Sequence, residues 1–102
     1  MKKKLSRRAA AKPTACGIRL RRLREAAGID ATQLSHVVGR SRTVVYQIEV
    51  GLIQYPSAAL GLRLASALGT TLEWLLNGDG KEPTALAVRR AFNKATKEQV
   101  EQ

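Results

Sequence analysis

Apolar side chains recur every three or four residues through residues 15–78, which is the period of an α-helix. The clearest stripe consists of Cys16, Leu20, Leu23 and Ala27, and arginines occupy the opposite face of the same predicted helix. Shorter stripes of the same period follow it. No segment shows the strict alternation of apolar and polar residues that is typical of a half-buried strand. The pattern therefore predicts an all-α fold.

Glycines and capping residues divide this pattern into five short helices. Glycine takes the left-handed conformation that ends many helices, and the stretches end at Gly28, Gly39, Gly51 and Gly69. Short polar side chains favour the N-cap position, and the candidates are Asp30, Ser41, Ser57 and Thr71. We therefore expect a compact five-helix domain over residues 15–78.

Two different segments flank the predicted domain. Residues 1–14 lack apolar periodicity and carry six Lys and Arg residues but no acid, which predicts a flexible basic arm. A solvated tail that only aids solubility is the alternative for this segment. Residues 79–102 begin as a linker after the turn sequence Asn77-Gly78. A thin apolar stripe over residues 84–100 then indicates a possible C-terminal helix.

The composition favours one class of function and argues against several others. The chain has 102 residues, a net charge of +10 and a pI of about 10.7, which favours a nucleic-acid partner. One Cys and one His cannot form a metal-ligand cluster, so we expect no metal and no cofactor. No catalytic pair or phosphate-binding loop is present, so we do not expect an enzyme. No apolar run is long enough to cross a membrane, and no secretory signal is recognisable, so we expect a cytoplasmic, nucleoid-associated protein.

The segment from about residue 30 to residue 50 has the form of a helix-turn-helix motif. Two short predicted helices are separated by Gly39, and the second is expected to begin at Ser41. In such motifs the second helix enters the major groove of DNA, while the first crosses the backbone. The motif therefore predicts double-stranded DNA as the partner.

The stretch from Cys16 to Gly78 also carries a longer set of residues in register. These residues are Leu20, Arg21, Arg22, Leu23, Arg24, Glu25, Gly28, Ile29, Gln33, Leu34, Ser35, Gly39, Ser41, Val45, Ile48, Glu49, Gly51, Pro56, Ser57, Leu64, Ala65, Leu68, Gly69, Trp74, Leu75, Leu76, Asn77 and Gly78. With them the chain resembles the lambda-repressor/Cro-like helix-turn-helix regulators, also called xenobiotic-response-element-type regulators. The resemblance implies a sequence-specific transcriptional regulator, expected to be a repressor, that reads a palindromic operator as a homodimer.

The resemblance also implies roles for single residues. The residues expected to contact bases are Arg42, Thr43, Tyr46 and Gln47. Arginine can donate two hydrogen bonds to guanine, glutamine can form two hydrogen bonds with adenine, and the threonine methyl can contact a thymine methyl. The residues expected to contact phosphates are Thr32, Gln33, Arg40 and Ser41. A structural ion pair joins Arg24 and Glu49, and the dimer-interface candidates are Trp74, Leu75 and Leu76.

The chain departs from the family pattern in the loop after the second helix of the motif. Family members often have polar or basic residues there, whereas this chain has Val50, Leu52, Ile53 and Tyr55. This apolar loop favours an alternative function: an antitoxin-type protein-interaction module that binds a toxin partner and autoregulates its operon. A third hypothesis is a non-specific nucleic-acid binder that depends on the basic arm.

Overall fold

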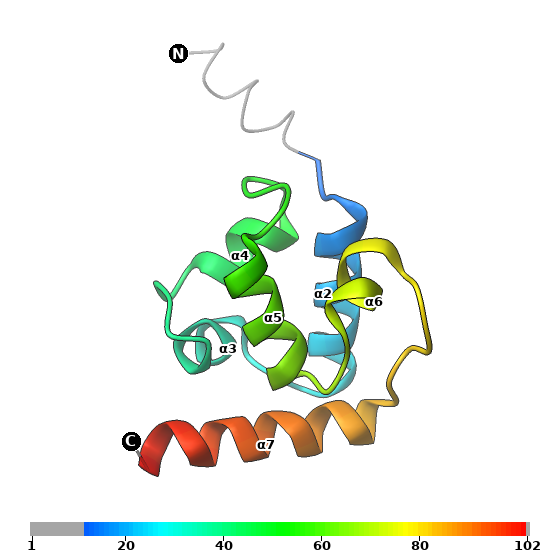
Figure 1. The fold of residues 1–102 in the computed structure, drawn as a ribbon. Coiled ribbons are helices and arrows are strands. Elements are labelled where there is room, and N and C mark those ends of the chain that lie inside the picture. The colour runs from blue at the N-terminus through cyan, green and yellow to red at the C-terminus, as the bar shows by residue number, and fades with distance from the viewer. Residues whose placement is uncertain (1–11, 102) are drawn as a thin grey trace.

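The computed structural model describes residues 12–101, and within them the chain is helical with no strand. The helices are α2 (Ala15–Ala26), α3 (Ala31–Val37), α4 (Val44–Glu49), α5 (Ala58–Ala67), α6 (Leu72–Asn77) and α7 (Ala85–Glu101) (Figure 1). The all-α prediction is confirmed for this part of the chain. The predicted basic arm falls almost entirely on residues 1–11, outside the described residues.

Several helices begin where the sequence predicts an N-cap. Asp30 accepts a hydrogen bond from the amide of Gln33 at 3.1 Å, and Ser57 and Thr71 make the same contact at the starts of α5 and α6. Thr14 does so for α2. Each contact satisfies an amide that has no partner within its helix, and such a cap is worth about 1 kcal/mol.

All six of these helices contribute to one aliphatic core. Its fully buried side chains include Leu20, Leu34, Ile48, Leu64, Leu75 and Val88. Helix α2 packs against α4 and α6, α3 packs against α4, and α5 packs against α6. Helix α7 runs along the lower side of these helices in Figure 1.

Two of the three dimer-interface candidates lie in the core of the single chain. Trp74 is 3 % exposed and Leu75 is 0 % exposed, so both pack against other helices of the same chain. Arg19 of α2 also donates to the carbonyl oxygens of Leu75 and Leu76, at 3.0 and 2.6 Å. A six-residue helix has little stability of its own. It therefore depends on burying its apolar face in its own domain. Of the three dimer-interface candidates, Leu76 alone is half-buried.

The helix expected over residues 84–100 is present as α7, and it packs against α2, α3 and α5. Val88 and Phe92 are buried in the common core, although the apolar stripe in the sequence is thin. Arg22 of α2 and Glu82 in the preceding linker form an ion pair at 2.6 Å. The C-terminal segment therefore completes the core that the first five of these helices form.

Candidate nucleic-acid interface

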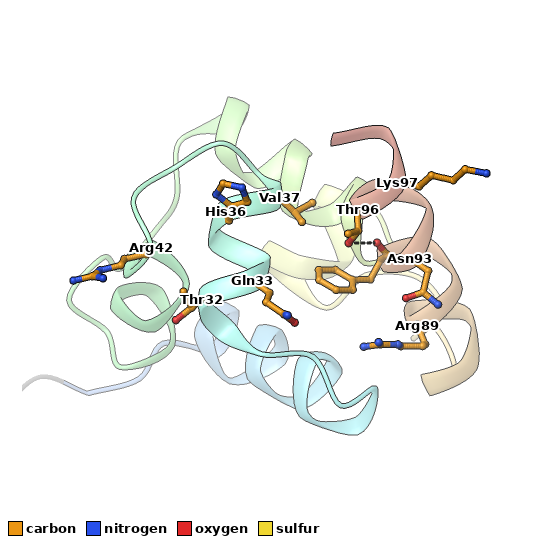
Figure 2. Close-up of a pocket in the computed structure, with 10 residues that line it drawn as sticks. Thr32, Gln33, His36, Val37, Arg42, Arg89, Asn93, Thr96 and Lys97 are labelled. Atoms are coloured by element: carbon orange, nitrogen blue, oxygen red, sulfur yellow. Dashed lines mark hydrogen bonds between the residues drawn. The ribbon is translucent and has the colours of Figure 1, made fainter. Parts of the chain in front are cut away.

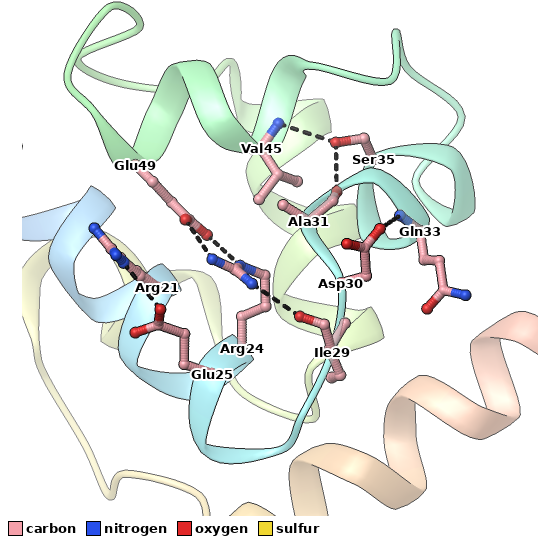
Figure 3. A network of polar contacts seen from close by, with 10 residues as sticks. All are labelled: Arg21, Arg24, Glu25, Ile29, Asp30, Ala31, Gln33, Ser35, Val45 and Glu49. Atoms are coloured by element: carbon pink, nitrogen blue, oxygen red, sulfur yellow. Dashed lines mark hydrogen bonds and ion pairs between the residues drawn. The ribbon is translucent and has the colours of Figure 1, made fainter.

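The angle between α3 and α4 is fixed by a buried hydroxyl. Ser35 of α3 donates to the carbonyl oxygen of Ala31 at 2.8 Å and accepts from the amide of Val45 at 3.1 Å (Figure 3). Ser35 is fully buried, so water does not compete for these two bonds. The first turn of α4 is thus attached directly to α3.

The second helix of the motif begins at Val44, so the expected start at Ser41 is wrong. Thr43 occupies the N-cap position, and its side chain makes no capping hydrogen bond. Two amides at this helix start have other partners: Val44 donates to the carbonyl oxygen of Ser41, and Val45 donates to the hydroxyl of Ser35. Because α3 supplies the cap, residues 41–43 form a turn that leads into α4.

The four base-contact candidates share one side of this turn and helix. Arg42, Thr43 and Tyr46 are exposed, and Gln47 is half-buried. The Gln47 amide nitrogen donates to the Thr43 hydroxyl at 3.2 Å, which orients the glutamine side chain. The structure therefore leaves three of these side chains exposed and one half-buried, and Arg42 and Thr43 precede the helix instead of opening it.

The phosphate-contact candidates are all exposed, but they do not form one cluster. Thr32 and Gln33 on α3 line a groove of about 880 Å³ together with Arg42 and with residues of α7 (Figure 2). Arg40 and Ser41 lie in the turn and are not part of the groove lining. The structure thus brings three of the proposed DNA-contacting residues to one groove.

An ion pair joins α2 to α4 behind this surface. The Arg24 guanidinium donates two hydrogen bonds to the Glu49 carboxylate, at 2.7 and 2.8 Å, and a third to the Ile29 carbonyl oxygen at 2.9 Å. The hydrogen bond to Glu49 raises the pKa of Arg24 above its ordinary value, so this cation persists at any working pH. These are the two residues for which the resemblance implies a pair. The contact holds the C-terminal end of α4.

Three features of this region were missed by the sequence analysis. A Cβ atom at Gly17 would collide with the carbonyl oxygen of Ile48 and lie 3.2 Å from the Glu49 Cα, so α2 and α4 cross in close contact there. A glycine within an apolar helical stripe is the signal for such a crossing. The second feature is the bridging role of Ser35. The third is the contribution of α7 to the groove, through Arg89, Asn93, Thr96 and Lys97.

The loop after α4 exposes apolar surface. Leu52 is 58 % exposed and Tyr55 is 73 % exposed, while Ile53 is half-buried and its amide donates to the Gln47 carbonyl oxygen. The loop is therefore attached to α4 but presents two large side chains to the surroundings.

Within residues 12–101 there is no group of three His, Cys, Asp or Glu side chains placed to hold a metal ion. None of the helices there has both the length and the apolar character needed to cross a membrane. The thiol of Cys16 is buried, and this burial raises its pKa, while the charge of Arg19 acts in the opposite direction.

Comparison with known proteins identifies the family. A family model described as a helix-turn-helix domain matches residues 15–76, which is more than half of the chain. Searches of curated proteins and of solved structures find no significant match. The matched segment runs from the start of α2 into α6 and contains the α3–turn–α4 motif. The chain therefore belongs to the helix-turn-helix domain family, a family of DNA-binding proteins.

Proposed function

We propose that this protein is a sequence-specific, Cro-like transcriptional repressor that binds a palindromic operator as a homodimer. The observation that carries the proposal is that Arg42, Thr43 and Tyr46 are exposed and Gln47 is partly exposed on a rigidly held motif. Rigid support matters because a base-reading side chain must be held close to its productive geometry.

Two buried contacts supply that support. Ser35 holds the first turn of α4 against α3, and Arg24 holds its last turn through Glu49. An interface that is ordered before binding loses less conformational entropy when DNA arrives. The motif is therefore suited to discriminating between bases, beyond attracting DNA by charge.

Each base-contact candidate has a defined chemical role in this proposal. Arg42 forks to O6 and N7 of a guanine, and the Thr43 methyl meets a thymine methyl. Gln47 uses one amide N–H on Thr43 and keeps its second N–H and its carbonyl oxygen for an adenine. Tyr46 is exposed beside them and reaches either a base or a phosphate.

The backbone is bound by side chains around these base-contact candidates. Thr32 and Gln33 on α3 and Arg40 and Ser41 in the turn are exposed and carry hydrogen-bond donors that suit phosphate oxygens. The net charge of +10 adds long-range attraction to DNA. The basic arm of residues 1–14 supplies much of this charge and makes further phosphate contacts in our proposal.

A homodimer must use apolar surface other than Trp74 and Leu75. The exposed apolar side chains include Leu52, Tyr55 and Leu62, and Leu76 remains partly accessible. A two-fold dimer would place its two recognition helices about 34 Å apart and therefore require half-sites about 10 base pairs apart.

Selection from random duplex DNA at a stated salt concentration tests the proposal. We expect a palindromic consensus and, by sedimentation on the selected duplex, two chains for each site. Recovery of unrelated sequences would overturn sequence-specific binding. A monomer at high micromolar concentration that stays monomeric on DNA would overturn the dimer.

The exposed loop supports a second candidate, the antitoxin-type module that binds a toxin partner. Leu52 and Tyr55 offer an apolar surface that has no phosphate-binding groups and that a partner protein could cover. If this second candidate is right, the protein forms a stable complex with the product of a neighbouring reading frame. That complex would be lost in L52S/Y55S, whereas DNA affinity would be kept. If no such complex forms, the antitoxin candidate is wrong and the repressor proposal alone remains.

A further inference from the structure

Helix α7 runs beside α3 and is attached to it at both ends. The Arg89 guanidinium lies 3.5 Å from the carbonyl oxygen of Gly28, just before α3 begins. Near the other end, the Gln99 side chain donates to the carbonyl oxygen of His36 at 3.4 Å. Phe92, between these contacts, and Val88, directly before Arg89, are buried in the core. The space between α3 and α7 is therefore a fixed feature of the fold.

Three cationic side chains and several hydrogen-bond donors line the groove between these helices, although most of its lining surface is apolar. Its lining from α3 and the turn consists of Thr32, Gln33, His36, Val37 and Arg42, and its lining from α7 consists of Arg89, Phe92, Asn93, Thr96 and Lys97. None of these side chains is acidic. Gln33 extends from α3 into the space between the two helices (Figure 2). Most of the remaining side chains can donate hydrogen bonds, which phosphate oxygens accept.

The cationic and amide groups of α7 are also regularly spaced. Arg89, Asn93 and Lys97 follow each other at intervals of four residues, so they form one row along the helix. Eight residues of α-helix span about 12 Å. Phosphates of one DNA strand rise by about 3.4 Å per nucleotide along the duplex axis and lie further apart along the strand itself, so a row of this length can reach two of them. The Arg89 guanidinium is held in place over the Phe92 ring, 5.7 Å from its centroid.

We infer that α7 extends the DNA interface beyond the helix-turn-helix motif, with the sugar–phosphate backbone of the duplex lying in the α3–α7 groove. Arg89, Asn93 and Lys97 contact phosphates from one side, and Thr32 and Gln33 contact them from the other. Arg42 lines the same groove, which makes this surface continuous with the base-contact candidates. The inference rests on the proposed function for its partner, and it adds an element that lies outside the segment matched by the family model.

The test compares two double variants with equal loss of charge on the full chain. R89A/K97A removes two cations from the groove. R90A/K94A removes two cations from exposed positions of the same helix that do not line the groove. The affinity of each protein for the selected duplex is measured over a range of salt concentrations. Circular dichroism checks that the helical content of both variants equals that of the wild type.

The two variants should differ in the salt dependence of binding. Each lost phosphate contact lowers the slope of log K against log salt by about 0.9, so R89A/K97A should lose nearly two from the magnitude of that slope. R90A/K94A should lose less than half as much, and both should select the wild-type consensus. Phosphate-ethylation interference should show which backbone positions R89A/K97A no longer contacts.

Other outcomes separate this inference from the proposed function. Equal slopes for the two variants would overturn the role of α7, including the case in which the groove takes a small organic anion instead. A wild-type protein that selects no consensus but shows the slope difference would overturn sequence-specific binding and leave the α7 contact standing. A wild-type protein that does not bind DNA would overturn both.

Discussion

The hydroxyl of Ser35 lies 3.1 Å from the amide nitrogen of Val45, and both residues are completely buried. This bond replaces the N-cap that α4 does not obtain from Thr43. The Ser35 hydroxyl therefore links the first turn of α4 directly to α3, in addition to the apolar packing between the two helices.

Replacing Ser35 by alanine should destabilise the fold by about 1–3 kcal/mol, because the Val45 amide would be left buried without a partner. Thermal or denaturant unfolding measures the loss. Ser66→Ala is the matched control, because Ser66 is exposed on α5 and its replacement should change the stability by no more than about 0.5 kcal/mol. Equal stability of the two variants would show that the Ser35 bond does not support the motif.

Removing one partner of the ion pair between Arg24 and Glu49 should likewise destabilise the fold. Glu49 is 6 % exposed, and its removal leaves the Arg24 cation without its partner, at a cost of about 3 kcal/mol. Glu49→Ala should lower the melting temperature and leave the selected DNA sequence unchanged, since Glu49 faces Arg24.

The exposed pair of Arg21 and Glu25 provides the control for that variant. Its atoms lie 3.2 Å apart and both side chains are more than half exposed, so Glu25→Ala should cost less than about 1 kcal/mol. A Glu49→Ala protein as stable as the Glu25→Ala protein would contradict the structural role of the pair.

Gly17→Ala should destabilise the protein by about 1–3 kcal/mol, because the added methyl group meets the backbone of α4, which cannot move aside alone. Gly61→Ala is the matched comparison. Its methyl group would meet only the end of the Leu72 side chain, and alanine is the better helix former by about 0.5–1 kcal/mol. We expect Gly61→Ala to be close to neutral. The reverse order of stabilities would show that α2 and α4 do not cross at Gly17.

Because of Cys16, the free energy of unfolding should fall as the pH becomes alkaline. Burial raises the pKa of its thiol in the folded chain, so above the ordinary thiol pKa of about 8.5 the unfolded chain ionises first. The folded state then binds more protons than the unfolded state, and the free energy of unfolding falls as the pH rises. Unfolding of the wild type and of Cys16→Ala between pH 7 and pH 10 measures the effect. A parallel pH dependence of the two proteins would contradict it.

The sequence predicts best what is determined by neighbouring residues. Asp30, Ser57 and Thr71 were expected to cap helices, and each accepts a bond from an amide three residues later. The start of α4 was misplaced because its cap comes from Ser35, whose relation to Val45 depends on how α3 and α4 pack.

Long-range packing limited the other sequence predictions. Trp74 and Leu75 were expected at a dimer interface because an apolar run at the end of a small domain does not show whether its own chain covers it. The structure shows that it does. The groove between α3 and α7 depends on two segments about 60 residues apart, so no local pattern indicates that Arg89 and Thr32 line one surface.

The most direct test of the central claim is operator selection with Arg42→Ala and Gln47→Ala beside the wild type. Both side chains lie outside the buried core, so both variants should fold normally. We predict that each variant loses about 1–3 kcal/mol of binding free energy and relaxes the preference at one base position of each half-site, a different position for each variant. If both variants bind the wild-type site with unchanged affinity and preference, the turn and helix from Arg42 to Gln47 do not read DNA.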